Sequence, residues 1–344
     1  MIHARQLRRT FRTESGPDVA AVRGVDLDVA EGELVAFLGP NGAGKSTTLR
    51  MLTTLLPPTS GTATVAGHDV ARDPAAVRRR IGYIGQGNGA GHYHRVRDEV
   101  VLQGRAYGLP WRDARRRADE LLTALQLTGL ADRTAGTLSG GQRRRLDIAM
   151  GLVHAPPLLF LDEPSTGLDP QNRANLWEHV LEVRERFGTT LFLTTHYLEE
   201  ADTMAERVMI IDDGRVIADD TPTRLKADLA GDQVVIGLAD PADVPRARGV
   251  ADRLATLHEV RAEGEQVHLR IPDGARILPD FLRQLHEDRV VVVSAEVARP
   301  TLDDVFLHLT GRSLREQVEA DADAGPDTPD AATVAAEAAP EVSA

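Results

Sequence analysis

The sequence predicts an α/β domain built on a parallel sheet, followed by a smaller α+β domain and an acidic tail. Over residues 1–225, short apolar runs that end in polar residues alternate with helical stretches, which is the pattern of a parallel sheet covered by helices. Residues 226–311 have few glycines and a regular apolar pattern. Residues 312–344 consist largely of Ala, Asp, Glu and Pro, so we expect this tail to be disordered.

Composition narrows the class of protein. The 344 residues include no cysteine, which excludes disulfides and thiolate metal sites and fits a reducing compartment. No apolar run reaches the ~18–20 residues of a membrane-crossing helix. The basic start lacks the apolar core of a signal peptide, so we expect any membrane role to come through a partner. Eight of the acidic residues behind the net charge of −12 lie from Glu316 onward, and the mildly acidic remainder argues against nucleic-acid binding.

The stretch "ELVAFLGPNGAGKSTTLRML" reads as an apolar strand, a glycine-rich loop and a helix. Such a loop curls around phosphate oxygens with its backbone N–H groups, while Lys45 can reach the β- and γ-phosphates and the Ser46 hydroxyl can bind Mg²⁺. The alternative, a plain glycine turn between strand and helix, does not require this spacing. The residues predicted to bind nucleotide here are Gly39, Pro40, Asn41, Gly42, Ala43, Gly44, Lys45, Ser46 and Thr47.

A second apolar run, in "PPLLFLDEPSTGLDP", ends in Asp162 and Glu163. In a parallel sheet, a buried strand delivers such carboxylates to the edge where the phosphate loop lies. We therefore predict that Asp162 holds Mg²⁺ through water and that Glu163 polarises an attacking water molecule. Solvated acids at an ordinary strand-to-turn junction are the alternative, which the upstream phosphate loop disfavours.

The other candidate residues have weaker sequence signals than these two motifs. His196 in "TLFLTTHYLEEAD" is predicted to contact the γ-phosphate rather than to serve as a core or cap residue. Gln86 ends "IGYIGQ" and would be an ordinary surface glutamine without this context. For Phe11, stacking on adenine and core packing both stay open. The "HYH" at 92–94 is interpreted as surface rather than as a metal site.

The stretch "TLSGGQRRRLDIAMGL" at 137–152 places Ser139, Gly140 and Gly141 just before a predicted helix. Glycines in this position expose backbone N–H groups to an anion. The chain therefore holds two loops that can bind phosphate. The arginines of "QRRRLD" here and of "RRRADE" at 115–120 are interpreted as solvated helix faces.

The region 226–311 reads as strand "QVVIGL", a helix around 243–256, strands "HEVRAE" and "QVHLRI", a helix around 275–287 and strand "VVVVSAEV". This β-α-β-β-α-β order is typical of a ferredoxin-like module. A last helix, "TLDDVFLHL", is expected to follow and to pack back.

With the phosphate loop, "LSGGQ", "LDEPSTGLD" and a downstream "TTH" in this order, residues 1–225 resemble the ATP-binding subunit of ABC transporters. The resemblance implies a P-loop NTPase fold of the ABC type, with a parallel sheet core and a helical subdomain. It also implies ATP and Mg²⁺ as ligands, with Glu163 as catalytic base, His196 as the switch histidine and Lys45 on the phosphates.

The remaining motifs of the family also have matches in this chain. Gln86 matches the residue that touches Mg²⁺ and the membrane subunit, beside the metal ligands Ser46 and Asp162. Ser139, Gly140, Gly141 and Gln142 match the signature motif, Asp169 ends the D-loop at 165–169, and Phe11 falls near the adenine-stacking aromatic. In this family two such domains pair head to tail, so the resemblance implies that the signature motif grips the nucleotide held by a second copy. This would explain the two loops.

The chain ends in "PTLDDVFLHLTGRSLRE", which resembles the daunorubicin-resistance type of drug-exporter ATPase, and "YLEEAD" and "DIAMGLVHAPPLLFLDEP" agree with that group. Some of its members carry glutamine at the switch position, so His196 favours full hydrolytic competence. After Gln86 the chain reads "GNGAGHYHRVRDEV" where relatives read closer to "TVREN". That segment faces the membrane subunit, so the identity of the membrane subunit stays open.

The resemblance implies an ATP-hydrolysing subunit that drives export of a drug, antibiotic or lipid-like compound through a separate multi-spanning permease. We expect it on the cytoplasmic face of the membrane as a homodimer. The first alternative is an importer ATPase whose C-terminal domain senses a small molecule. The second is an ABC-type ATPase that acts on ribosomes or chromosomes without transport, although such proteins typically carry two ATP domains or a long coiled-coil insertion.

Overall fold

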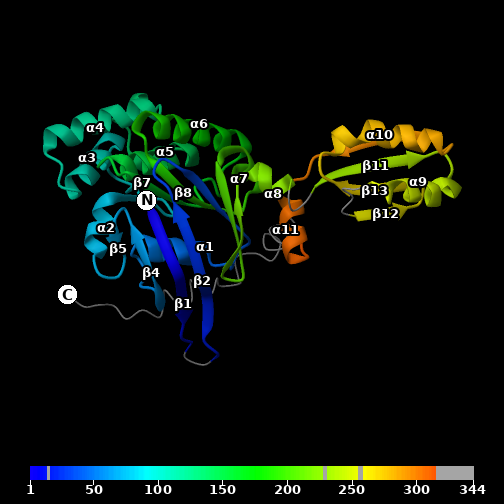
Figure 1. Ribbon diagram of the computed structural model, residues 1–344. Helices are drawn as coiled ribbons and strands as arrows, with labels where there is room; N and C mark the ends of the chain where they lie inside the picture. The colour runs from blue at the N-terminus through cyan, green and yellow to red at the C-terminus, as the bar shows by residue number, and fades with distance from the viewer. Residues whose placement is uncertain (14–15, 228–230, 255–258, 315–344) are drawn as a thin grey trace. The chain divides into compact units, whose positions relative to one another are not determined.

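The computed structural model describes residues 1–13, 16–227, 231–254 and 259–314 (Figure 1). The chain divides into two compact units, the first spanning Met1–Asp219 and the second beginning at Asp220. The short helix α8 (Pro222–Leu225) therefore belongs to the second unit, whereas the domain boundary predicted from the sequence follows Leu225. Among the helices of the described residues, none combines the length and the apolarity that a bilayer crossing requires.

A parallel sheet lies at the centre of the first unit, as predicted, with the strand order β10-β9-β3-β8-β7-β6. Strand β3 pairs in parallel with β8 and β9, and β7 pairs in parallel with β6 and β8. The carboxyl ends of β3, β6, β7 and β8 therefore meet at one edge. The strands are β3 (Leu34–Leu38), β6 (Ile81–Ile84), β7 (Leu158–Asp162), β8 (Thr190–Thr195), β9 (Arg207–Asp212) and β10 (Arg215–Asp220).

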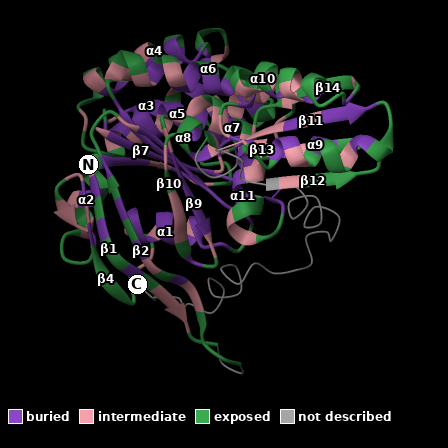
Figure 2. Cartoon of the chain, turned by 45° about the vertical axis from the view of Figure 1, so that its right-hand side comes forward, coloured by how far each residue is buried: buried purple, intermediate pink, exposed green. Residues whose placement is uncertain are grey.

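Every residue of β3, β7 and β8 is buried, which is why these strands read as continuous apolar runs rather than as alternating ones (Figure 2). Phe192 on β8 packs against Phe37 on β3 and Phe160 on β7, with ring centroids 5.6 and 5.7 Å apart. These contacts fix the spacing of the three strands whose ends carry the candidate site.

A second sheet, with the order β2-β1-β4-β5, was not predicted from the sequence. Its strand pairs are antiparallel, and register shifts interrupt β1 between Ala4 and Leu7 and again near Arg9. Such bulges break the two-residue period by which a half-buried strand is recognised. The strands are β1 (Ile2–Phe11), β2 (Val19–Val29), β4 (Ser60–Val65) and β5 (His68–Asp69).

The helices of the first unit fall into two groups. Helices α3, α4 and α5 contact one another and form the predicted helical subdomain (Figure 1). The others lie beside the sheets. The bounds are α1 (Lys45–Leu52), α2 (Pro74–Arg80), α3 (Val96–Ala106), α4 (Trp111–Ala124), α5 (Gly140–Leu152), α6 (Pro170–Phe187) and α7 (Leu198–Met204).

His154, just after α5, is a buried titratable group outside the candidate site. Its ring stacks on Tyr107 with centroids 3.7 Å apart and donates a hydrogen bond to the Ile81 carbonyl at 3.0 Å. Burial lowers the pKa of His154 to about 4, although the hydrogen bond to Ile81 opposes this. Because burial favours the neutral ring, the unfolded state binds a proton on His154 more readily than the folded state does. The free energy of unfolding therefore falls as the pH falls from 6.5 to 4.

We therefore expect the free energy of unfolding to fall by about 2–3 kcal/mol between pH 7 and pH 4 on account of His154. His154→Gln, whose amide can still donate to Ile81, should flatten this decline in urea titrations at both pH values. The matched control is His308→Gln, at an exposed position on a helix of the second unit. Equal declines in wild type and His154→Gln would contradict the assignment.

The second unit has the predicted β-α-β-β-α-β order, with an antiparallel sheet of order β12-β13-β11-β14. Helices α9 and α10 pack on this sheet, and the core between them includes Val234, Ile236, Leu269 and Phe281. The elements are β11 (Asp232–Leu238), α9 (Val244–Ala251), β12 (Glu259–Glu263), β13 (Gln266–Ile271), α10 (Gly274–Glu287) and β14 (Val292–Ala298).

Helix α11 (Leu302–Thr310) follows β14 and contacts α8, so the predicted last helix packs within its own unit. Its capping box joins Thr301 to Asp304. The predicted disordered tail lies mostly outside the described residues, but its start is ordered. Leu314 is fully buried, and the Leu314 amide and the Ser313 hydroxyl both donate to Asp303.

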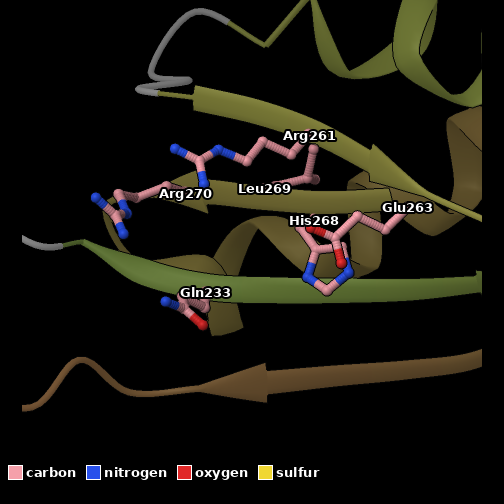
Figure 3. Close-up of a pocket in the computed structure, with 6 residues that line it drawn as sticks. All are labelled: Gln233, Arg261, Glu263, His268, Leu269 and Arg270. Atoms are coloured by element: carbon pink, nitrogen blue, oxygen red, sulfur yellow. The ribbon is translucent and has the colours of Figure 1, made fainter. Parts of the chain in front are cut away.

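The sheet of the second unit also carries a small cavity of about 140 Å³ (Figure 3). Residues along β13 alternate between the helix-covered core and the opposite side, which places His268 and Arg270 away from the helices. The lining side chains include two arginines and one glutamate, so the charges are mixed; they are Gln233, Arg261, Glu263, His268, Leu269 and Arg270.

Candidate functional site

The phosphate loop runs from the end of β3 to the start of α1, as its sequence predicts. At two positions of the loop only glycine fits, because a carbonyl oxygen from another part of the chain lies too close for a Cβ atom. A Cβ on Gly39 would lie 2.2 Å from the Ile211 carbonyl oxygen, and a Cβ on Gly44 would lie 2.5 Å from that of Ala21. Gly44 also has a φ of 98°, which disfavours any other residue. The loop is therefore packed tightly against the strand that ends at Asp212 and against β2, and a side chain at either glycine would disturb it.

Lys45, the first residue of α1, is almost completely buried. Its Nζ donates to the carbonyl oxygens of Gly39 at 2.8 Å and Pro40 at 3.0 Å, and lies 3.4 Å from Oε1 of Glu163. The ammonium group is thus held over its own loop, where a phosphate can exchange with these partners. This links the phosphate loop directly to the end of β7.

Asp162 at the end of β7 binds two hydroxyl groups, one of which also accepts from an amide. Its Oδ1 accepts from the Ser46 hydroxyl at 2.9 Å and the Thr194 hydroxyl at 2.7 Å, and the Gln86 amide reaches Ser46 Oγ at 3.3 Å. Burial raises the pKa of Asp162, and these two hydroxyl groups oppose the rise. Its Oδ2 is buried and has no hydrogen-bond partner among the residues that the structure describes. An orphaned carboxylate oxygen beside Ser46 and Gln86 fits the oxygen-rich coordination that Mg²⁺ prefers.

Glu163 lies between Lys45 and His196, whose Nδ1 is 3.2 Å from Glu163 Oε2. Burial alone would raise the pKa of Glu163, but His196 and Lys45 outweigh it and lower the pKa to about 2. The residue has a φ of 46°, a left-handed conformation that costs on the order of 1 kcal/mol or more outside glycine. This backbone turn directs the carboxylate toward the phosphate loop rather than into the strand.

Arg144 is part of this arrangement and was not predicted. The sequence "QRRRLD" predicts a solvated helix face, whereas the Arg144 side chain is buried and contacts three carbonyl groups. Its guanidinium donates to Gly85 and Pro164 at 2.7 Å each and to Asp162 at 3.3 Å. The arginine therefore joins α5 to the ends of β6 and β7. No sequence signal reveals this, because the acceptors are backbone oxygens.

Asp147, one turn further along α5, holds the segment that follows Gln86. Its Oδ1 accepts from the Gly89 and Ala90 amides at 3.0 and 3.1 Å.

Within residues 92–94, Tyr93 is 93% exposed, in agreement with the surface interpretation. In the described part of the chain, no group of three or more His, Cys, Asp or Glu side chains could hold a metal ion.

The predicted signature residues form the start of α5. Ser139 caps the helix through a reciprocal capping box with Gln142. A Cβ on Gly141 would lie 2.9 Å from the Asn172 side chain, whose amide donates to Asp169 at the start of α6. The signature residues and Asp169 thus lie side by side, joined through the Asn172 side chain.

Phe11 is half-buried at the end of β1, opposite Val19. The guanidinium of Arg9 lies 4.7 Å from its ring centroid. Its predicted contact with adenine stays a prediction. Of the predicted residues, the structure brings Lys45, Ser46, Gln86, Asp162, Glu163 and His196 into one cluster.

Comparison with known proteins agrees with this geometry. The sequence profile of the family described as ABC transporter matches residues 22–166, and that of the DrrA1-3-like ATP-binding protein C-terminal domain matches residues 221–310. The chain is 47% identical to the daunorubicin resistance ATP-binding protein DrrA2 of Streptomyces coeruleorubidus, over 85% of this chain and 90% of the relative. It is 32% identical to the linearmycin resistance ATP-binding protein LnrL of Bacillus subtilis, over 92% and 100%.

Solved structures give the same result for the first unit. The ATP-binding cassette MJ0796, a dimer bound to ADP and phosphate, superposes with a TM-score of 0.59 at 26% identity and covers 64% of this chain and 98% of its own. The cbiO1 protein of Clostridium perfringens, part of the cbiONQ transporter complex, gives 0.60 at 27% identity, over 74% and 95%.

Proposed function

Because this chain belongs to the family of ABC transporter ATP-binding subunits, we propose that it powers export of a drug, an antibiotic or a lipid-like compound through a separate multi-spanning permease. Its ATPase activity follows from the family. The similarity to drug-resistance relatives spans both units, including the C-terminal domain at 221–310, and this observation supports export over import. In this proposal the chain lies on the cytoplasmic face, held there by the permease.

The cluster at the strand ends supports a specific division of labour in hydrolysis. Lys45 exchanges its contacts with Gly39 and Pro40 for the phosphates of ATP. Glu163 accepts a proton from the attacking water, and His196 holds the carboxylate at 3.2 Å in the orientation this requires. Ser46, Gln86 and Asp162 would hold Mg²⁺, which when bound would neutralise charge on the phosphate oxygens.

A second copy completes each site in this proposal. The phosphate loop of one chain and residues 139–142 of the other close on one nucleotide head to tail. The N-terminal end of α5 favours negative charge because its first N–H groups point outward along the helix axis. Dimeric relatives among the solved structures are consistent with two chains per working unit.

The head-to-tail arrangement predicts complementation between two inactive variants. Lys45→Ala disables the phosphate loop and Ser139→Arg disables the signature end, so each variant alone should lack turnover. In an equal mixture, a heterodimer contains one site built from two intact halves, and about a quarter of the sites should be restored. ATP turnover of the mixture measures this. If the mixture is no more active than the single variants, the proposal that two chains share each nucleotide site is wrong.

The transport proposal is tested by purifying the tagged chain from membranes of its host in mild detergent and identifying what accompanies it. A permease of several apolar helices, without an extracellular binding protein, supports export. A solute-binding lipoprotein in the complex would indicate import. Recovery with ribosomes or nucleic acid in the soluble fraction would contradict a transport role.

A further inference from the structure

We propose that Glu200, on α7, is a positioning residue that fixes the turn at 165–169 to the strand end carrying His196. The proposal rests on the ATPase function described above and adds a residue to its machinery. Glu200 is only 3% exposed, and neither the resemblance nor the strand-end argument assigns a role to it. A buried carboxylate needs partners on both oxygens, and here the two oxygens bind different segments.

One oxygen of Glu200 binds the turn that follows β7. The Ser165 hydroxyl, itself buried, donates to Oε1 of Glu200 through a short hydrogen bond. The neighbouring Thr166 hydroxyl lies 3.3 Å from Oε2 of Glu163. The turn is therefore in contact with both the candidate base and Glu200.

The other oxygen binds the end of β8. The Thr195 hydroxyl donates to Oε2 of Glu200 at 2.8 Å, and the same hydroxyl accepts from the Tyr197 amide at 2.9 Å. These two contacts enclose His196 in the sequence. Because the two oxygens of one carboxylate bind the two segments, the turn and His196 are held in a fixed position relative to each other.

Arg173 on α6 completes the cluster and balances its charge. Its Nε lies 3.8 Å from Glu200 Oε1, and its guanidinium lies 3.9 Å from the centroid of the Tyr197 ring. It also reaches the Leu168 carbonyl at 3.5 Å. The Tyr197 ring in turn packs on His196 with centroids 4.2 Å apart. Every member of the cluster thus contacts either the turn or the segment with His196.

The chemical consequence concerns the orientation of the base. His196 sets the position of the Glu163 carboxylate, and Glu200 sets the position of His196 relative to the turn. A Cβ on Gly140 would lie 3.7 Å from the Leu168 side chain, so the turn lies beside the signature residues that meet the second copy in the proposed dimer. Glu200 would therefore transmit the closure of the two chains to the base. A purely structural role would instead change stability and leave turnover per folded molecule unchanged.

The test is a double-mutant cycle on the purified full-length chain, with Glu200→Gln, Ser165→Ala and both together. We expect each single variant to lower kcat roughly tenfold to a hundredfold, because a shift of about 1 Å in a catalytic group has this effect, with KM for ATP within about twofold. The double variant should be no slower than the slower single variant, since both break one connection. Glu199→Gln, the exposed neighbour, is the matched control and should match wild type.

Two outcomes would overturn the proposal. One is an unchanged kcat in Ser165→Ala and Glu200→Gln together with a lowered thermal midpoint, which would indicate that the two residues only stabilise the fold. The other is multiplication of the two effects in the double variant, which indicates independent roles. If Glu200→Gln fails to fold, Ser165→Ala decides by the same criterion. Wild-type turnover and its loss in Glu163→Gln, measured in parallel, separate a failure of this proposal from a failure of the ATPase assignment.

Discussion

Glu163→Gln should lower ATP turnover by about 10²–10⁴-fold while ATP binding persists. The amide keeps the shape of the side chain but accepts no proton, and it removes the negative charge between Lys45 and His196. Nucleotide affinity, turnover and light scattering in the presence of ATP measure the three consequences: retained binding, lost hydrolysis and an accumulated ATP-bound dimer. Glu178→Gln, at an exposed carboxylate on α6, serves as control. Turnover above a tenth of wild type would contradict the role of Glu163 as base.

Glu163→Gln also tests how the ionised Glu163 carboxylate contributes to the stability of the fold. The pKa of Glu163 is lowered to about 2 in the folded protein, so the ionised group stabilises the fold above pH 4.5. This contribution is lost as the pH falls from 4.5 to 2. The difference in unfolding free energy between wild type and Glu163→Gln should therefore shrink over that window.

Arg144→Ala should destabilise the protein by about 3–5 kcal/mol. The substitution leaves the carbonyl oxygens of Gly85, Asp162 and Pro164 without the guanidinium that satisfies them. Arg144→Lys should recover only part of the loss, because an ammonium group cannot span all three in the geometry of a planar fork. Urea unfolding measures both effects.

The control for this prediction is Arg115→Ala, at an exposed position on α4. It should change the free energy of unfolding by less than about 0.5 kcal/mol. If Arg144→Ala costs no more than this control, the three hydrogen bonds contribute nothing to stability and the assignment is wrong.

The parallel sheet was predictable because its central strands are buried on both faces. The runs at 34–38, 158–161 and 191–193 are apolar throughout, and a continuous apolar run bounded by turns is a strong signal. The antiparallel sheet was not predicted because bulges in β1 disturb its alternation. In the second unit the strands carry fewer bulges, and the order of its elements was predicted correctly.

The same logic explains the candidate site. Asp162, Glu163 and His196 follow strands that end at one edge of a parallel sheet, so their proximity could be inferred from the sequence. Arg144 and Glu200 lie on helices instead, and charged residues on helices ordinarily face solvent. Their partners are backbone carbonyls in one case and hydroxyl groups in the other. Neither partner set carries a spacing that the sequence reveals.

The two hydrogen bonds that Asp147 accepts from the Gly89 and Ala90 amides have a consequence for solvent exchange. Both amides belong to a segment without regular structure, where deuterium ordinarily replaces hydrogen quickly. Here exchange requires the Asp147 carboxylate to release both amides. The rate at which these two amides take up deuterium therefore reports how often this side chain on α5 separates from the residues that follow Gln86, without any label attached to the chain.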